Sequence, residues 1–171
     1  PAAGYEVDHV VVDGQNKGQI NSYTFSNVSS GHTITAYFRV AGRIEVGTPS
    51  VRDNTGASLS GGSIKSGYGI QVEAPVTAVG VTDVQVDLTY NFGSGVKTVR
   101  MESGGGKYVL PANSASPTGA HVVYIPVETQ DGTYTLNITV TAKKVNGETL
   151  TQSTSSTVTV RGNMYEDDFT G

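Results

Sequence analysis

Residues 131–142 read DGTYTLNITVTA, and this stretch decides the fold class. From Tyr134 onward every second residue is apolar, and the residues between them are threonines and one asparagine. Such alternation predicts a β-strand, because successive side chains of a strand point to opposite faces of the sheet. We expect the apolar face to lie on a core and the hydroxyl-rich face to meet water.

Further alternating runs follow one another along residues 43–161, with turn residues about every 8–12 positions, a spacing typical of a β-sandwich. Asn146–Gly147 predicts a hairpin turn, because both residues tolerate a positive φ. Pro75 lacks a backbone N–H and is expected to end its strand. We expect a loop at 103–106, an edge segment at 48–62, and further strands at 43–47, 63–74, 81–92, 96–101, 107–110, 121–127 and 149–160.

Residues 1–41 form a separate block with about three expected strands. The first covers Tyr5–Val12, where the apolar face changes between Val7 and Val10, as a β-bulge would cause. Tyr23–Phe25 and Ile34–Phe38 alternate and predict the other two strands. Three strands bury little core by themselves. We therefore expect a domain at 1–41, a hinge at 41–42, a sandwich at 43–161 and an acidic linker or tail at 162–171.

Composition excludes several classes of protein. Only 15% of the 171 residues are charged and the net charge is −4, so the basic stripe of a nucleic-acid binder is missing. Cysteine is absent, which excludes a disulfide framework, a Cys-ligated zinc site and a thiol nucleophile. No apolar run reaches 18 residues, so we expect no membrane insertion. We expect the chain to be part of a longer protein.

The first block resembles the C-terminal half of a divergent InlB B-type repeat, a family of bacterial surface and secreted proteins. The resemblance rests on Gly4-Tyr5, Val7, Val10, Val12-Asp13-Gly14, Gly18, Tyr23-Thr24-Phe25, Asn27-Val28, His32-Thr33-Ile34, Ala36 and Phe38. In that family a glycine-rich pair of strands precedes the position equivalent to Pro1. Those strands are missing here, and a neighbouring domain, a second chain or truncation could each explain their absence.

The second block resembles bacterial immunoglobulin-like domains at Asp131-Gly132-Thr133-Tyr134. In those domains a DGTYT segment opens the penultimate strand. The resemblance implies a tyrosine corner, in which the Tyr134 hydroxyl bonds to the backbone just upstream. The Cys–Trp–Cys core of antibody domains is absent, because the chain has neither residue. The expected fold is therefore all-β, a partial InlB-B-like repeat followed by an Ig-like antiparallel β-sandwich.

No set of residues predicts catalysis, a cofactor or a metal. The histidines lack metal-ligand spacing, so we expect them to make structural hydrogen bonds. We expect Asp83 and Asp87 to be solvated. The serines of the 111–119 loop are expected to lack a catalytic partner. A loop calcium site at Asp53–Asn54 and Asp131 and a Lys–Asn isopeptide bond are minor alternatives. The residues concerned are His9, His32, His121, Ser114, Ser116 and, for the isopeptide bond, Lys65, Lys97 and Lys107.

Tyr68 and Tyr108 are the aromatic residues that we expect to be exposed and to contact a ligand, because they flank glycines outside the alternating runs. Sugar-binding sandwiches display such rings. The sequence and its resemblances predict a non-catalytic spacer or adhesion-type module of an exported bacterial surface protein or a large secreted enzyme. The alternative is a carbohydrate-binding accessory module. Expected partners are other modules of the parent chain, with cell-wall or extracellular polysaccharide or a protein as further candidates.

Overall fold

The computed structural model describes residues 1–112 and 121–162, and within these ranges the chain is all β, with no α-helix. A single 3₁₀ turn lies at Ser60–Gly62. Contacts divide the chain into two compact units, Pro1–Gly42 and the part from Arg43 onward. Apart from Gly162, the expected tail at 162–171 lies outside the described residues, as do Ser114 and Ser116.

The first unit is a three-stranded antiparallel sheet in the order β2-β1-β3. Its strands are β1 (Tyr5–Val12), β2 (Gln15–Asn16) and β3 (Ile34–Val40). The register between β1 and β3 shifts between Val7 and His9, which confirms the predicted bulge. One face of β1 and β3 is apolar, and on the other Arg39 bonds to Glu6 and Asp8.

The strand predicted at Tyr23–Phe25 is wrong, because residues 17–33 hold no strand. The Phe25 ring instead packs on Tyr23 and His32, with ring centroids 5.0 and 4.5 Å away. The C-terminal half of β1 already has β3 on one side and β2 on the other, so no edge remains there for a further strand. Alternation alone does not report whether a partner is available.

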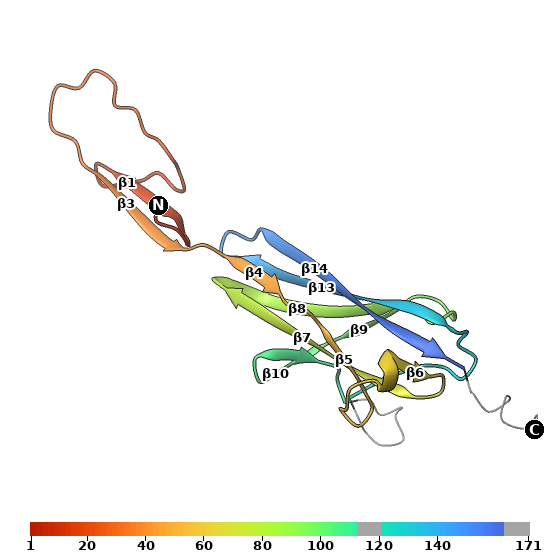
Figure 1. Ribbon diagram of the computed structural model, residues 1–171. Helices are drawn as coiled ribbons and strands as arrows, with labels where there is room; N and C mark the ends of the chain where they lie inside the picture. The colour runs from red at the N-terminus through yellow and green to blue at the C-terminus, as the bar shows by residue number, and fades with distance from the viewer. Residues whose placement is uncertain (113–120, 163–171) are drawn as a thin grey trace, which may run out of the picture. The chain divides into compact units, whose positions relative to one another are not determined.

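The second unit is a β-sandwich of two sheets (Figure 1). In the first sheet, β7 (Gly69–Val79) pairs on one side with β4 (Arg43–Val46) and β5 (Ser50–Asp53), and on the other with β11 (Lys107–Val109) and β12 (Val123–Tyr124). The strand β10 (Glu102–Gly104) lies beyond β11. The second sheet has the order β6-β14-β13-β8-β9. Its strands are β6 (Ser63–Lys65), β14 (Thr149–Arg161), β13 (Gly132–Lys144), β8 (Val81–Tyr90) and β9 (Lys97–Arg100).

The connectivity follows the order of an immunoglobulin sandwich. Strands β4/β5, β7, β11/β12 and β10 correspond to A, B, E and D, and β8, β13 and β14 correspond to C, F and G. All pairs are antiparallel except that of β6 and β14. The sequence prediction of an all-β, antiparallel sandwich is therefore confirmed.

The core lies between the two sheets and is made of the alternating residues. On β13, Leu136, Ile138 and Val140 are fully buried, while Asn137 is exposed. The same alternation buries Ile70, Val72 and Ala74 on β7, Val86 and Leu88 on β8, and Val158 and Val160 on β14. Burial of each such Val, Leu or Ile side chain contributes about 1.5–3 kcal/mol, so the period-2 pattern supplies most of the hydrophobic stabilisation of the sandwich.

Pro75 does not end its strand, contrary to expectation, because β7 continues to Val79. Along one side of β7, residues up to Glu73 pair with β5, and residues from Val76 onward pair with β4. Pro75 falls in that gap, where its missing N–H leaves no ladder bond unmade. Its carbonyl still accepts the N–H of Gly47 at 2.8 Å.

Two other expectations need correction. The segment expected as a loop at 103–106 contains the end of β10, and Gly105 and Gly106 alone form its turn to β11. Asp87 is not simply solvated, because its Oδ1 accepts a hydrogen bond from Arg100 Nε at 2.5 Å. Both features depend on cross-strand partners, which the pattern of a single strand does not specify.

Candidate functional site

The loops of the sandwich gather at one of its ends. At one end Arg43 pairs with Val79, and the turn from β7 to β8 is Gly80 alone. At the other end Arg161 pairs with Lys65. The longer connections at 54–62, 91–96 and 125–131 also lie at this second end. We call it the loop end.

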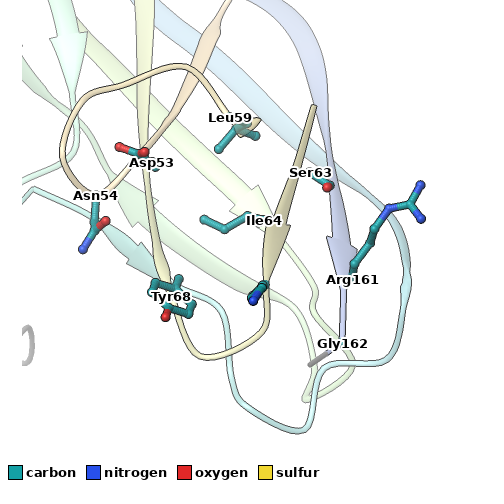
Figure 2. A pocket seen from close by; sticks show the side chains of 9 residues that line it. Asp53, Asn54, Leu59, Ser63, Ile64, Tyr68, Arg161 and Gly162 are labelled. Atoms are coloured by element: carbon teal, nitrogen blue, oxygen red, sulfur yellow. The ribbon is translucent and has the colours of Figure 1, made fainter. Parts of the chain in front are cut away.

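A pocket of about 490 Å³ opens at the loop end between β5, β6 and the start of β7. Its lining residues are Asp53, Asn54, Leu59, Ser63, Ile64, Lys65, Tyr68, Arg161 and Gly162. Figure 2 shows Ile64 in the middle of these residues, Tyr68 and Asp53 on one flank, and the Arg161 guanidinium directed away. This volume is in the range of small-ligand sites, and its lining mixes apolar and polar groups as such sites do.

Tyr68 presents its ring from a fixed backbone. Its carbonyl accepts the N–H of Ile125 at 2.9 Å, and the carbonyl of Ile125 accepts the N–H of Gly67 at 2.8 Å. Gly67 has φ +85°, and a Cβ there would lie 3.0 Å from Val127, so the turn requires glycine. Tyr68 is 53% exposed, so about half of the residue is accessible to a ligand.

The Asp53 carboxylate is occupied within its own loop. Its Oδ1 accepts the hydroxyl of Thr55 at 2.6 Å and the backbone N–H groups of Thr55 and Ala57. The side-chain hydrogen bond from Thr55, followed by the backbone N–H groups, lowers the pKa of Asp53 although burial opposes this. Asp53 therefore stays ionised at neutral pH, and its hydrogen bonds fix this part of the pocket wall.

Tyr108 is not the exposed side chain that the sequence predicts. It lies on β11 between β7 and β10, and its ring packs against the hydrophobic core. Tyr108 pairs with Ala74, six residues along β7 from Tyr68, which corresponds to about 20 Å. The two predicted contact residues are therefore not brought together, and Tyr68 alone lies in the pocket.

The sandwich has another exposed tyrosine, Tyr124, which the sequence analysis does not single out. Tyr124 on β12 is 51% exposed and lines another hollow of about 430 Å³ with Tyr90, Lys97 and Pro126. Val123 points into the core, so the alternation of residues 121–127 would have placed Tyr124 outside. Tyr124 is not among the residues that line the Tyr68 pocket, although its hydroxyl lies near Gly67, the residue before Tyr68.

Tyr134 lies near the start of β13, where its hydroxyl donates a hydrogen bond to the carbonyl of Gln130 at 2.7 Å. Its ring also packs on Phe92 in a T-shaped contact, with ring centroids 5.5 Å apart. These contacts tie the 125–131 loop to the strand that follows it.

The minor alternatives find little support among the described residues. No group of three or more His, Asp or Glu residues there could hold a metal ion. Asp131 lines a different hollow from Asp53 and accepts the N–H of Gly162. Of the isopeptide candidates, Lys107 pairs with Glu73 at 3.3 Å, and Lys65 and Lys97 are exposed.

Each histidine makes a hydrogen bond through Nδ1, all three at 2.7 Å. His9 pairs with Asp8, and His32 pairs with Asp13. His121 donates to the carbonyl of Leu110. The expectation of structural hydrogen bonds is confirmed for all three histidines.

Comparison with known proteins gives one match. A family model described as Domain of unknown function (DUF8195) matches residues 32–168, from just before β3 through the sandwich. No curated protein and no solved structure matches the chain. Within residues 1–112 and 121–162, no helix has the length and apolar character needed to cross a membrane.

Proposed function

The chain belongs to the DUF8195 family, whose description assigns no function, and we propose that it serves as a non-catalytic spacer or adhesion-type module of an exported bacterial protein. The parent would be a surface protein or a large secreted enzyme. The resemblance of residues 1–41 to InlB B-type repeats and that of the sandwich to bacterial Ig-like domains stay predictions, and both agree with this role.

The observation that carries the proposal is the path of the chain through the sandwich. The chain enters at Arg43, beside Val79, and reaches Arg161, beside Lys65, at the opposite end (Figure 1). The module therefore adds its own length to the chain rather than returning the chain to its starting point. The 13 residues of β14 correspond to about 40 Å of added reach.

Location gives the first test of this proposal. Antibodies raised against the sandwich should label intact cells of the encoding organism or detect the protein in its culture medium. Detection only after cell lysis, in a soluble internal fraction, would contradict the proposal.

Replacement gives the second test. In the full-length parent, residues 43–162 are exchanged for an unrelated sandwich of equal length, or for a glycine–serine linker of equal residue number. A spacer role predicts that the sandwich restores the parent's activity and that the flexible linker restores less. Loss of activity with both replacements would assign specific contacts to this module instead.

Carbohydrate binding is the second candidate function, and the Tyr68 pocket favours it. Pull-down with cell-wall and extracellular polysaccharides tests it on the intact chain. Binding that is lost in Tyr68→Ala and kept in Tyr124→Ala, a matched exposed tyrosine that lines another hollow, would support the pocket. Binding kept in both variants, or no binding by the native chain, would contradict it.

A further inference from the structure

We propose that the sandwich resists tension applied along the chain, because its first and last strands are held in shear. This inference rests on the proposed spacer role and deepens it. It depends on the directions of the strands, the bonds that hold them and the apolar side chains that lock them.

The first and last strands of the sandwich run in the same direction. β4 starts at Arg43, at the end where β7 finishes with Val79. β14 runs toward Arg161, which pairs with Lys65 at the loop end. Tension on the two ends of the sandwich therefore pulls β4 and β14 in opposite directions, each along its own axis.

Pulling a strand along its axis acts across its ladder bonds. Those bonds run perpendicular to the strands of an antiparallel pair, so the load is shared and the bonds must break together. β4 and β5 each form four register pairs with β7. β14 forms twelve register pairs with β13 and three with β6, the latter in a parallel pair.

Apolar side chains oppose the same sliding. Ile44 on β4 is buried, as are Val158 and Val160 on β14. Moving either strand by one residue would turn these side chains from the core face to the solvent face. Tension must therefore break the ladders and expose core residues in one step.

Another pulling direction on the same molecule lacks this protection. Thr82, at the start of β8, pairs with Lys143, near the end of β13. Force applied near these two residues separates β8 from β13 at one end, so the ladder bonds open one after another. The unfolding force in this direction is therefore the reference for the force measured when the chain is pulled from its termini.

Single-molecule stretching of the full 171-residue chain tests the inference. Handles are attached at the chain termini, or at the exposed positions Thr82→Cys and Val145→Cys, which are the only thiols because the native chain has no cysteine. With terminal handles, the sandwich should lengthen by roughly 350 Å and the first unit by roughly 120 Å, which separates the two events. We expect a higher unfolding force for the sandwich with terminal handles than with the 82/145 handles. Equal forces would overturn the inference.

A variant of β4 sharpens the test. Glu45 is exposed and pairs with Thr77 of β7. The N–H of Gly47, two residues later, bonds to the carbonyl of Pro75, so the N–H of Glu45 faces β7 as well. Glu45→Pro should lower the force with terminal handles and leave the force with 82/145 handles unchanged. Val86→Ala, a core change on β8, is the control, since it should lower stability in urea without this directional effect.

The outcomes separate this inference from the proposed function. A terminal force unchanged by Glu45→Pro contradicts the shear mechanism. If Glu45→Pro does not fold, Ile44→Ala is measured in its place, with the same expected directional loss and the same contradicting result. The spacer role instead fails through internal location or through the replacement experiment, neither of which changes these forces.

Discussion

Tyr134 joins the loop before β13 to the strand itself through one hydrogen bond to the Gln130 carbonyl. Tyr134→Phe removes this bond and keeps the ring contact with Phe92. We expect a loss of about 1 kcal/mol in the free energy of unfolding, measured in urea. Tyr68→Phe is the control, because its ring is exposed, and it should cost little. Equal stability of the native chain and Tyr134→Phe would argue against a structural role for the hydroxyl.

Tyr90 is a half-buried phenol at the end of β8, and burial raises its pKa above 10.0. The folded state thus holds this proton at pH values where the unfolded chain releases it. The resulting stability is complete below pH about 10 and is lost as pH rises through the folded pKa. Absorbance titration of tyrosinate should show a late-titrating phenol that Tyr90→Phe removes. Identical titration curves for the two proteins would contradict this prediction.

The change of partner along β7 depends on a glycine opposite a proline. A Cβ on Gly47 would lie 2.7 Å from Pro75 Cγ, so β4 and β5 pass Pro75 only if residue 47 has no side chain. We expect Gly47→Ala to cost about 1–3 kcal/mol in thermal or urea unfolding. Gly104→Ala on β10 is the control, since its Cβ would meet Val109 at an ordinary 3.5 Å. Similar stability of the two variants would show that the strand can move away from Pro75.

Asp13 closes the long connection between β2 and β3. It accepts the N–H of Thr33 and pairs with His32, and these two hydrogen bonds, the first being the larger cause, lower its pKa below 3.8. The stability this carboxylate contributes is therefore present above pH about 3.8 and is lost as pH falls through the lower folded pKa. The amide signal of Thr33 in NMR should move over this acid range.

Asp13→Asn isolates that effect. Asparagine tolerates the positive φ of 49° at this position and cannot titrate. The acid-dependent change of the Thr33 signal should then disappear. Its persistence in the variant would assign the transition to another group.

The two units of the molecule differ in how much apolar surface they bury. In the first unit only Val10 and Val12 are buried, and Ile34 and Phe38 on the same sheet face remain more than half exposed. The second unit holds a continuous core between two sheets. A chain that starts at Arg43 should therefore give dispersed NMR signals, and residues 1–42 alone should not. A well-dispersed spectrum from residues 1–42 would contradict this expectation.

The strands with the strongest apolar alternation are those whose bounds the sequence predicts best. Residues 131–142 and 149–160 were predicted as strands, and β13 and β14 extend them by a few residues at most. The strand expected at 121–127 is reduced to Val123–Tyr124, because β12 meets β7 only at Gly69 and Ile70. At the pocket, the glycines that flank Tyr68 point to it, whereas Asp53 comes from β5 and Ser63 and Ile64 come from β6, and no local signal links the two strands.

By itself, the sequence determined the all-β class, the strongest strands and the burial of their apolar faces. Period-2 alternation and turn residues depend on positions close together in the chain, so they can be recognised directly in the sequence. Only the tertiary structure decided which strands pair with one another. As a result β7 continues past Pro75, Tyr108 packs partly against the core while Tyr68 is exposed, and Arg43 and Arg161 lie at opposite ends of the sandwich. These features depend on which distant strands pair and in what register, and this pairing is set by packing of the whole core.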